Sequence, residues 1–325
     1  MRSVDCALGA DPLPYVTEKE FGKMKNWMDT RNVLALGLLI ASLTLFGCGG
    51  GGTAGTTNPP GINGTISGMA VKGPVAGATV AAFAVNNGAM GQQIGTAQTD
   101  GQGNFTMAVG EYSGPVMLQM TGGTYTDEAS GETMPMQAGD VMTAVIPSIS
   151  AGETVGGMQI TPLTSMAQTM AQAMGGGLTP DNISAANTSV GHYFMVGDIL
   201  QTTPMNPLVT GAGNSSDQEM RNYGIAVAAM SQLASDLGLS SSSNIVTAMM
   251  DDAADGRMNG MMGTSPIQMG GGMMGGTMMS SNAGTSDLAS AMSQFIQSPM
   301  NRSGVTLTDM QGLMDNLTSS NGVIQ

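Results

Sequence analysis

The hydrophobic pattern of this 325-residue chain changes its period near residue 160, and this change constrains the fold more than any other feature. Residues 61–160 contain short apolar segments in which every second residue is apolar, separated by Gly, Asn and Asp. This alternation is typical of antiparallel β-strands. After Ile160 the apolar residues recur every three or four positions, as they do on one face of an α-helix. The sequence therefore predicts an α+β multidomain protein, β-rich over 61–160 and all-α over 161–325.

The β-rich part has the composition of a small all-β domain. Segments 79–85, 104–109 and 116–120 show the alternation, and residues 100–103 (DGQG) lie just before the second of them. Glycine tolerates the positive φ that hairpins often need, so DGQG predicts a tight turn. About seven such segments within about a hundred residues predict a small β-sandwich.

Helix signals begin directly after Ile160. Thr161 is a good N-cap and Pro162 suits the first helical position. The apolar residues that follow lie three or four positions apart until Gly175; they are Leu163, Met166, Met170 and Met174. We therefore expect a helix after Thr161, with the methionines of its apolar face in the core.

Five more helices complete the predicted bundle. Ser216 and Glu219 have the spacing of a capping box, and the helix that they start is expected to end before Gly238. Thr308 and Gln311 repeat the capping-box spacing in the last predicted helix. That last helix is expected at 308–318, and the remaining three are expected at 180–200, 243–254 and 286–297. Each contributes an apolar stripe to one core.

A short apolar run near the beginning of the chain ends at a cysteine. The 14 residues 33–46 are too few for a membrane-spanning helix and fit the core of a signal peptide. The following residues 45–48 (LFGC) resemble the lipobox of bacterial lipoproteins. The resemblance implies that 1–47 is a signal-peptide region and that Cys48 becomes the lipidated N-terminus. The predicted location is therefore the cell envelope, with an N-terminal lipid as the attachment to the membrane.

Two details refine this expectation. The charged flank of the signal begins at Met24, so translation is expected to start at Met24 or Met28, with 1–23 outside the product. Gly49 and Gly50 follow the cysteine, where lipoproteins retained in the inner membrane often have Asp. This resembles lipoproteins sent to the outer membrane of Gram-negative bacteria. In a Gram-positive host the outer face of the cytoplasmic membrane would be the location.

The chain that follows the signal is strongly acidic. The net charge of the sequence is −14, and the charges before residue 48 cancel one another. The remaining cations are scattered, namely Lys72, Arg221, Arg257 and Arg302. Such a surface is a poor partner for nucleic acid. Residues 48–60 are rich in Gly and Thr and predict a flexible tether between lipid and first domain.

Three segments carry a resemblance to known families. Residues 73–80 (GPVAGATV) and 99–105 (TDGQGNF) resemble the carboxypeptidase regulatory-like domain. The resemblance implies an Ig-like, transthyretin-like β-sandwich over 61–160 and a non-catalytic module, because such modules are attached to many different proteins. Residues 124–131 (TYTDEASG) resemble uncharacterised bacterial lipoproteins that pair this sandwich with a helical C-terminal half. That likeness transfers no catalytic residue.

The chain contains 33 methionines, and a Met- and Gly-rich loop is expected at 256–284. Its candidate ligands are Met258, Met261, Met262, Met269, Met273, Met274, Met278 and Met279. Thioether sulfur is a soft ligand that suits Cu(I) or Ag(I). The loop has no packing period, so its methionines are not expected in the core. The alternative is a low-complexity insertion that binds nothing.

An acidic segment at 251–260 (DDAADGRMNG) partly matches a calcium-binding loop. Asp251, Asp255 and Asn259 would supply oxygen ligands around Gly256. Ala253 and Met262 occupy positions that require oxygen ligands, however. The favoured alternative is the end of a helix that runs into an Asp-Gly turn.

No motif of the chain predicts catalysis. The single histidine, His192, has no suitably spaced cysteine, serine or acid nearby. We therefore expect a non-enzymatic, lipid-anchored envelope protein with a binding or structural role and no cofactor. A protein partner is compatible with this role, and the sequence identifies none. Soft-metal binding through the loop is the second hypothesis, and a hydrolase built from dispersed carboxylates is the third.

Overall fold

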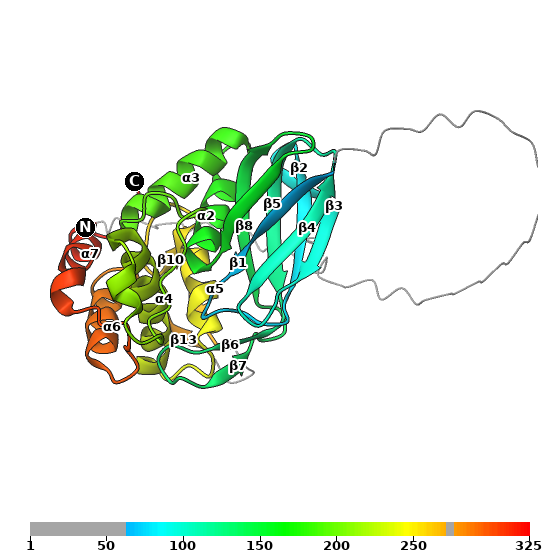
Figure 1. Ribbon diagram of the computed structural model, residues 1–325. Coiled ribbons are helices and arrows are strands. Elements are labelled where there is room, and N and C mark those ends of the chain that lie inside the picture. Colours follow the sequence, from blue (N-terminus) through cyan, green and yellow to red (C-terminus); the bar gives the residue numbers. More distant parts are fainter. Residues whose placement is uncertain (1–62, 271–275) are drawn as a thin grey trace, which may run out of the picture. The chain divides into compact units, whose positions relative to one another are not determined.

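The computed structural model describes residues 63–270 and 276–325, and residues 58–325 belong to one compact unit. Mostly antiparallel sheets occupy the first part of this region and six helices follow (Figure 1). The predicted mixture of a β-rich half and a helical half is therefore confirmed, but the half predicted as all-α also contains four short strands between residues 261 and 278. Cys48 and the expected signal and tether lie outside the described residues.

Seven of the strands form two sheets. The four-stranded sheet has the order β3-β2-β5-β8 and is antiparallel throughout. The three-stranded sheet has the order β4-β1-β9, with β1 antiparallel to β4 and parallel to β9. The strands are β1 (Gly64–Ala70), β2 (Thr79–Asn86), β3 (Ala89–Gln98), β4 (Asn104–Gly110), β5 (Gly114–Thr121), β8 (Val141–Ile149) and β9 (Thr154–Ile160). A small hairpin, β6 (Thr124–Thr126) with β7 (Thr133–Pro135), lies between β5 and β8 in the chain.

The predicted turn at 100–103 is present. Asp100 Oδ1 accepts hydrogen bonds from the backbone N–H groups of Gln102 and Asn104, both at 2.8 Å, and Gly103 has φ +83°. The strands on either side of the turn pair in different sheets, however, so the turn carries the chain from one sheet to the other. Local turn chemistry determines the reversal but not the pairing of the strands.

The two sheets share one buried cluster, and the four-stranded sheet also contributes to a second. Ile66, Phe105 and Leu118 belong to the cluster between the sheets. Met117 and Val145 belong instead to the cluster formed by the helices. Helices α2 (Pro162–Ala173) and α3 (Pro180–Tyr193) pack against β8, the edge strand of this sheet, as Figure 1 shows. Consecutive residues are buried in the middle of β5 and of β8. The alternation predicted for 116–120 therefore does not separate buried from exposed residues.

The helices are α2 (Pro162–Ala173), α3 (Pro180–Tyr193), α4 (Gln218–Asp236), α5 (Ser243–Ala253), α6 (Ser286–Gln297) and α7 (Leu307–Ser319). The Thr161 cap is confirmed, since its side chain accepts a hydrogen bond from the backbone N–H of Thr164. Helix α3 ends earlier than expected because Met195 adopts φ +53°. No helix within the two described ranges has both the length and the apolar character needed to cross a membrane.

Two predicted caps are wrong by one or two residues. Asp217, and not Ser216, caps α4 by accepting a hydrogen bond from Met220 N at 2.9 Å. Glu219 instead accepts a hydrogen bond from the backbone N–H of Gly197. Helix α7 is capped by Thr306, so the predicted cap residue Thr308 lies inside the helix. A cap needs an extended backbone as well as a suitable side chain, and the sequence spacing shows only the side chain.

The Met-rich segment differs from the expected loop. Short paired strands fold it back along the chain: β10 (Met261–Met262) with β11 (Ser265–Pro266), and β12 (Gln268–Met269) with β13 (Thr277–Met278). Met258, Met269 and Met279 are buried in the cluster formed by the helices. The expectation that these methionines stay out of the core is therefore wrong. Met269 lies in a paired strand, and Met258 and Met279 lie just outside the paired segments, so burial here needs no helical period.

A close backbone contact at Gly224 provides a test of this packing. A Cβ atom at Gly224, on α4, would lie 1.9 Å from the carbonyl oxygen of Met205. We expect Gly224→Ala to lower the free energy of unfolding in urea by about 1–3 kcal/mol, although alanine favours helices. Gly312→Ala on α7 is the matched control, since its Cβ would meet only the end of the Met195 side chain at 3.9 Å. The free energy of unfolding of the control should rise by about 0.5–1 kcal/mol, because alanine favours helices more than glycine does. A gain for Gly224→Ala would contradict the described contact.

Candidate functional site

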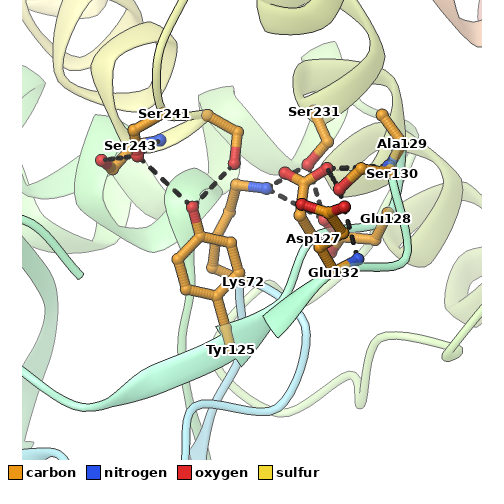
Figure 2. A network of polar contacts seen from close by, with 11 residues as sticks. Lys72, Tyr125, Asp127, Glu128, Ala129, Ser130, Glu132, Ser231, Ser241 and Ser243 are labelled. Carbon is orange, nitrogen blue, oxygen red and sulfur yellow. Dashed lines mark hydrogen bonds and ion pairs between the residues drawn. The ribbon is translucent and has the colours of Figure 1, made fainter. Parts of the chain in front are cut away.

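A buried lysine between β1 and β2 is the centre of a polar network (Figure 2). Lys72 is 0% exposed, and its Nζ donates hydrogen bonds to Glu128 Oε2 at 3.0 Å and to Ser231 Oγ. Ser231 Oγ, on α4, donates in turn to the same Glu128 oxygen at 2.6 Å. The network therefore joins the end of β1, the β6–β7 turn and a helix.

Asp127 shapes the turn that holds Glu128. Its Oδ1 accepts hydrogen bonds from the backbone N–H groups of Ala129 and Ser130 and from Ser130 Oγ, at 3.0–3.1 Å. Burial acts to raise the pKa of Asp127, but the charge of Lys72 and hydrogen bonds from Ser242 and Ser130 outweigh it, so the pKa is lowered from its ordinary value. Asp127 is therefore a second negative charge beside Lys72.

Tyr125 extends the network to the start of α5. Its ring centroid lies 5.4 Å from Lys72 Nζ, and its hydroxyl is 2.9 Å from Ser242 Oγ. Ser241 and Ser243 are linked through their Oγ atoms at 2.7 Å, and Figure 2 shows Ser241 beside the same tyrosine hydroxyl. The segment 125–130 is thus fastened to two helices.

The network contains residue types that can perform nucleophilic catalysis, and here they form a buried, hydrogen-bonded ion pair. In a Ser-Lys pair a neutral lysine removes the serine proton. Here Ser231 donates a hydrogen bond to the Glu128 carboxylate, and Lys72 forms an ion pair with the same carboxylate. The lysine and the serine are both buried. Removing one partner of such a pair leaves an uncompensated charge in the interior, so the arrangement holds the three segments in one geometry.

A mainly apolar cavity of about 200 Å³ lies next to the network. Glu128 is one of its lining residues, and most of the others are apolar. They come from the end of β1 and the loop after it, the segment 203–207, and α4: Met69, Val71, Pro74, Pro204, Met205, Pro207 and Val227. The contact at Gly224 brings the segment 203–207 against α4 and so forms one wall.

The predicted soft-metal ligands are divided between core and surface. Met258, Met269 and Met279 are buried, and Met261 is half-buried. Met262 and Met278 are 52% and 50% exposed. Met273 and Met274 lie outside the described residues. Three of the eight candidate thioethers are therefore occupied in apolar packing.

The predicted calcium ligands lie at the end of α5. Asp255 Oδ1 accepts a hydrogen bond from Arg257 N, and Asn259 Oδ1 accepts one from Met261 N. Asp251 is half-buried on α5, which ends at Ala253 and runs into the turn at Gly256 (φ +79°). Helix α5 therefore runs into an Asp-Gly turn, as the alternative expects. Within 63–270 and 276–325, no group of three or more His, Cys, Asp or Glu side chains is placed to hold a metal ion.

Asp252, which the sequence analysis did not select, organises this end of α5. Its Oδ1 accepts hydrogen bonds from the backbone N–H groups of Asn259, Gly260 and Met261, at 2.8–3.2 Å. Its Oδ2 is buried and has no hydrogen-bond partner among the residues described. Burial raises the pKa of Asp252 to about 6, although the three N–H groups act to lower it.

His192 is exposed at the end of α3 and lines an open depression with residues near the end of the chain, including Asn316 and Ser320. The sequence analysis did not predict the Lys72 network. One signal was available: Lys72 directly follows the apolar pair 70–71 and is one of four cations after residue 48. Its partners Glu128 and Ser231 are far away in the sequence, and no local pattern marks them.

Comparisons with known proteins add no family. A scan against protein-family models and a search of curated proteins each find no match. Among solved structures, a 9R-lipoxygenase from Cyanothece PCC8801 is similar over 34% of this chain and 18% of its own, at 13% identity and a TM-score of 0.20. A likeness at this TM-score carries no argument about function, which is therefore inferred from the site itself.

The buried ion pair predicts a non-additive pair of substitutions. Lys72→Met leaves Glu128 without its cation, so we expect the free energy of unfolding in urea to fall by about 3–5 kcal/mol. Adding Glu128→Gln removes the unpaired charge and should recover at least half of that loss. A double variant whose free energy of unfolding falls as much as that of Lys72→Met, or further, would show that the pair does not hold the site together.

Asp252 predicts a pH-dependent stability. Its pKa is about 6 in the folded protein against an ordinary value of 3.8, so the stability that the protonated carboxyl contributes is full below pH 3.8 and is lost as the pH rises through 6. Asp252→Asn cannot titrate at this position. We therefore expect the free energy of unfolding of the variant to rise, relative to that of the unsubstituted protein, by about 2–3 kcal/mol as the pH increases from 4 to 7.5. Urea unfolding across this range measures the difference. The exposed Asp236→Asn is the control, and an equal gain there would contradict the role of burial.

Proposed function

We propose that this protein is a non-enzymatic, lipid-anchored component of the bacterial cell envelope that binds a small, mainly apolar ligand. The observation that carries the binding role is the cavity of about 200 Å³ beside the Lys72 network. An apolar cavity of about 150 Å³ is enough to bind benzene in another protein. Apolar walls with a few polar groups are typical of small-molecule sites.

The envelope location depends on the lipobox resemblance at 45–48. A lipid on Cys48 would supply the membrane attachment, with the outer membrane of a Gram-negative bacterium as the proposed location. The strongly acidic charge of −14 agrees with a surface that repels nucleic acid and anionic lipid. A protein partner in the envelope is compatible with this role.

The proposed architecture of the β-rich part is a transthyretin-like β-sandwich. Two sheets of four and three strands that share one buried cluster support it. The segments that carry the resemblance, 73–80 and 99–105, lead into β2 and β4. In this arrangement the β-rich part acts as a support that presents one wall of the cavity to α4.

Binding of toluene tests the proposed function. A ligand that binds only the folded state raises the melting temperature, so toluene should stabilise the protein in a concentration-dependent manner. Val227→Phe, inside the cavity, should abolish this shift. Val209→Phe is the matched control, because Val209 is 52% exposed and lies outside the cavity lining. No shift in the unsubstituted protein, or an equal shift in both variants, would contradict binding in the cavity.

A further inference from the structure

We propose that the ligand of the cavity is a small hydrophobic cation, a primary ammonium group on an apolar chain or ring, and that its ammonium binds Glu128. This inference deepens the proposed function and depends on it. Three observations lead to the ammonium: the free side of the Glu128 carboxylate, the charge of the buried cluster and the chemistry of the walls.

The Glu128 carboxylate uses one oxygen for the protein and leaves the other available. Both Lys72 Nζ and Ser231 Oγ contact Oε2. Among the residues that the structure describes, none makes a hydrogen bond to Oε1. The side chain is 2% exposed and lines the cavity. A donor that enters the cavity would therefore meet a carboxylate oxygen held in place by the two contacts on its partner oxygen.

The buried cluster around this oxygen carries one excess negative charge. Lys72 provides one positive charge, while Asp127 and Glu128 provide two negative charges. All three residues are buried, and the Lys72–Glu128 contact is the ion pair that the structure shows for this lysine. A buried net charge is costly unless it is compensated, so a ligand cation is favoured over a neutral ligand and an anion is disfavoured.

The walls restrict the rest of the ligand. Methionine, valine and proline side chains form most of the lining, and Gln102, Thr203 and Asn206 add polar groups, so the body of the ligand must be mainly apolar. Because a cavity of about 150 Å³ accommodates benzene, a cavity of about 200 Å³ suits roughly six to ten non-hydrogen atoms. An amine of this size places its charged end at Glu128 and its apolar end against Pro204 and Val227.

Isothermal titration with three probes of similar shape tests this inference at pH 7. The probes are 2-phenylethylamine, which is cationic, 2-phenylethanol, which is neutral, and 3-phenylpropanoate, which is anionic. We expect the amine to bind at least tenfold more tightly than the alcohol, and the carboxylate to bind most weakly. Equal affinities for amine and alcohol would overturn the inference but leave the cavity as an apolar site. If none of the three binds, the proposed function itself fails.

Substitutions assign the charge preference to named residues. Glu128→Gln should remove the preference, so that the amine binds no more tightly than the alcohol. Asp127→Asn keeps the acceptor of the turn and removes the excess charge, so it should weaken amine binding about threefold or more. Val227→Phe should abolish binding of both probes. An amine preference that survives both Glu128→Gln and Asp127→Asn would overturn the assignment. If Glu128→Gln does not fold, Asp127→Asn and the three-probe comparison still decide.

Discussion

The ion pair between Lys72 and Glu128 is the interaction on which the arrangement of this protein depends. It is buried, and Ser231 completes it from a helix that begins about ninety residues after Glu128. Each member comes from a different element, so none can satisfy its charge or hydroxyl within its own part of the chain. Because an unpaired buried charge costs several kcal/mol, the β-rich part and α4 are held together when the network forms.

The same contact explains why the cavity lies where it does. The turn that carries Glu128 is drawn toward α4, while Gly224 allows the segment 203–207 to approach the helix backbone. The cavity lies between these contacts and the end of β1, with Pro204 and Met69 among its lining residues. Glu128 is its charged lining residue, and the network contacts only one of the two Glu128 oxygens.

Sequence analysis predicted the elements whose determinants are local. The helix at 286–297 has the predicted bounds, and the Thr161–Pro162 start is correct. Capping was predicted less well because the backbone conformation decides between neighbouring candidates such as Ser216 and Asp217. The burial of Met258 and the sheet membership of the strands around the 100–103 turn depend on distant parts of the chain, and no local pattern contains that information.

The candidate site was the least predictable part for the same reason. Lys72 and Ser231 are 159 residues apart, and each alone resembles an ordinary surface residue. Native-state hydrogen exchange tests most directly whether their contact makes the sheets and helices one cooperative unit. We predict that the slowest amides of β5 and α4 exchange with the same free energy of opening and the same dependence on denaturant. Protection of β5 that persists after α4 has opened would contradict this account.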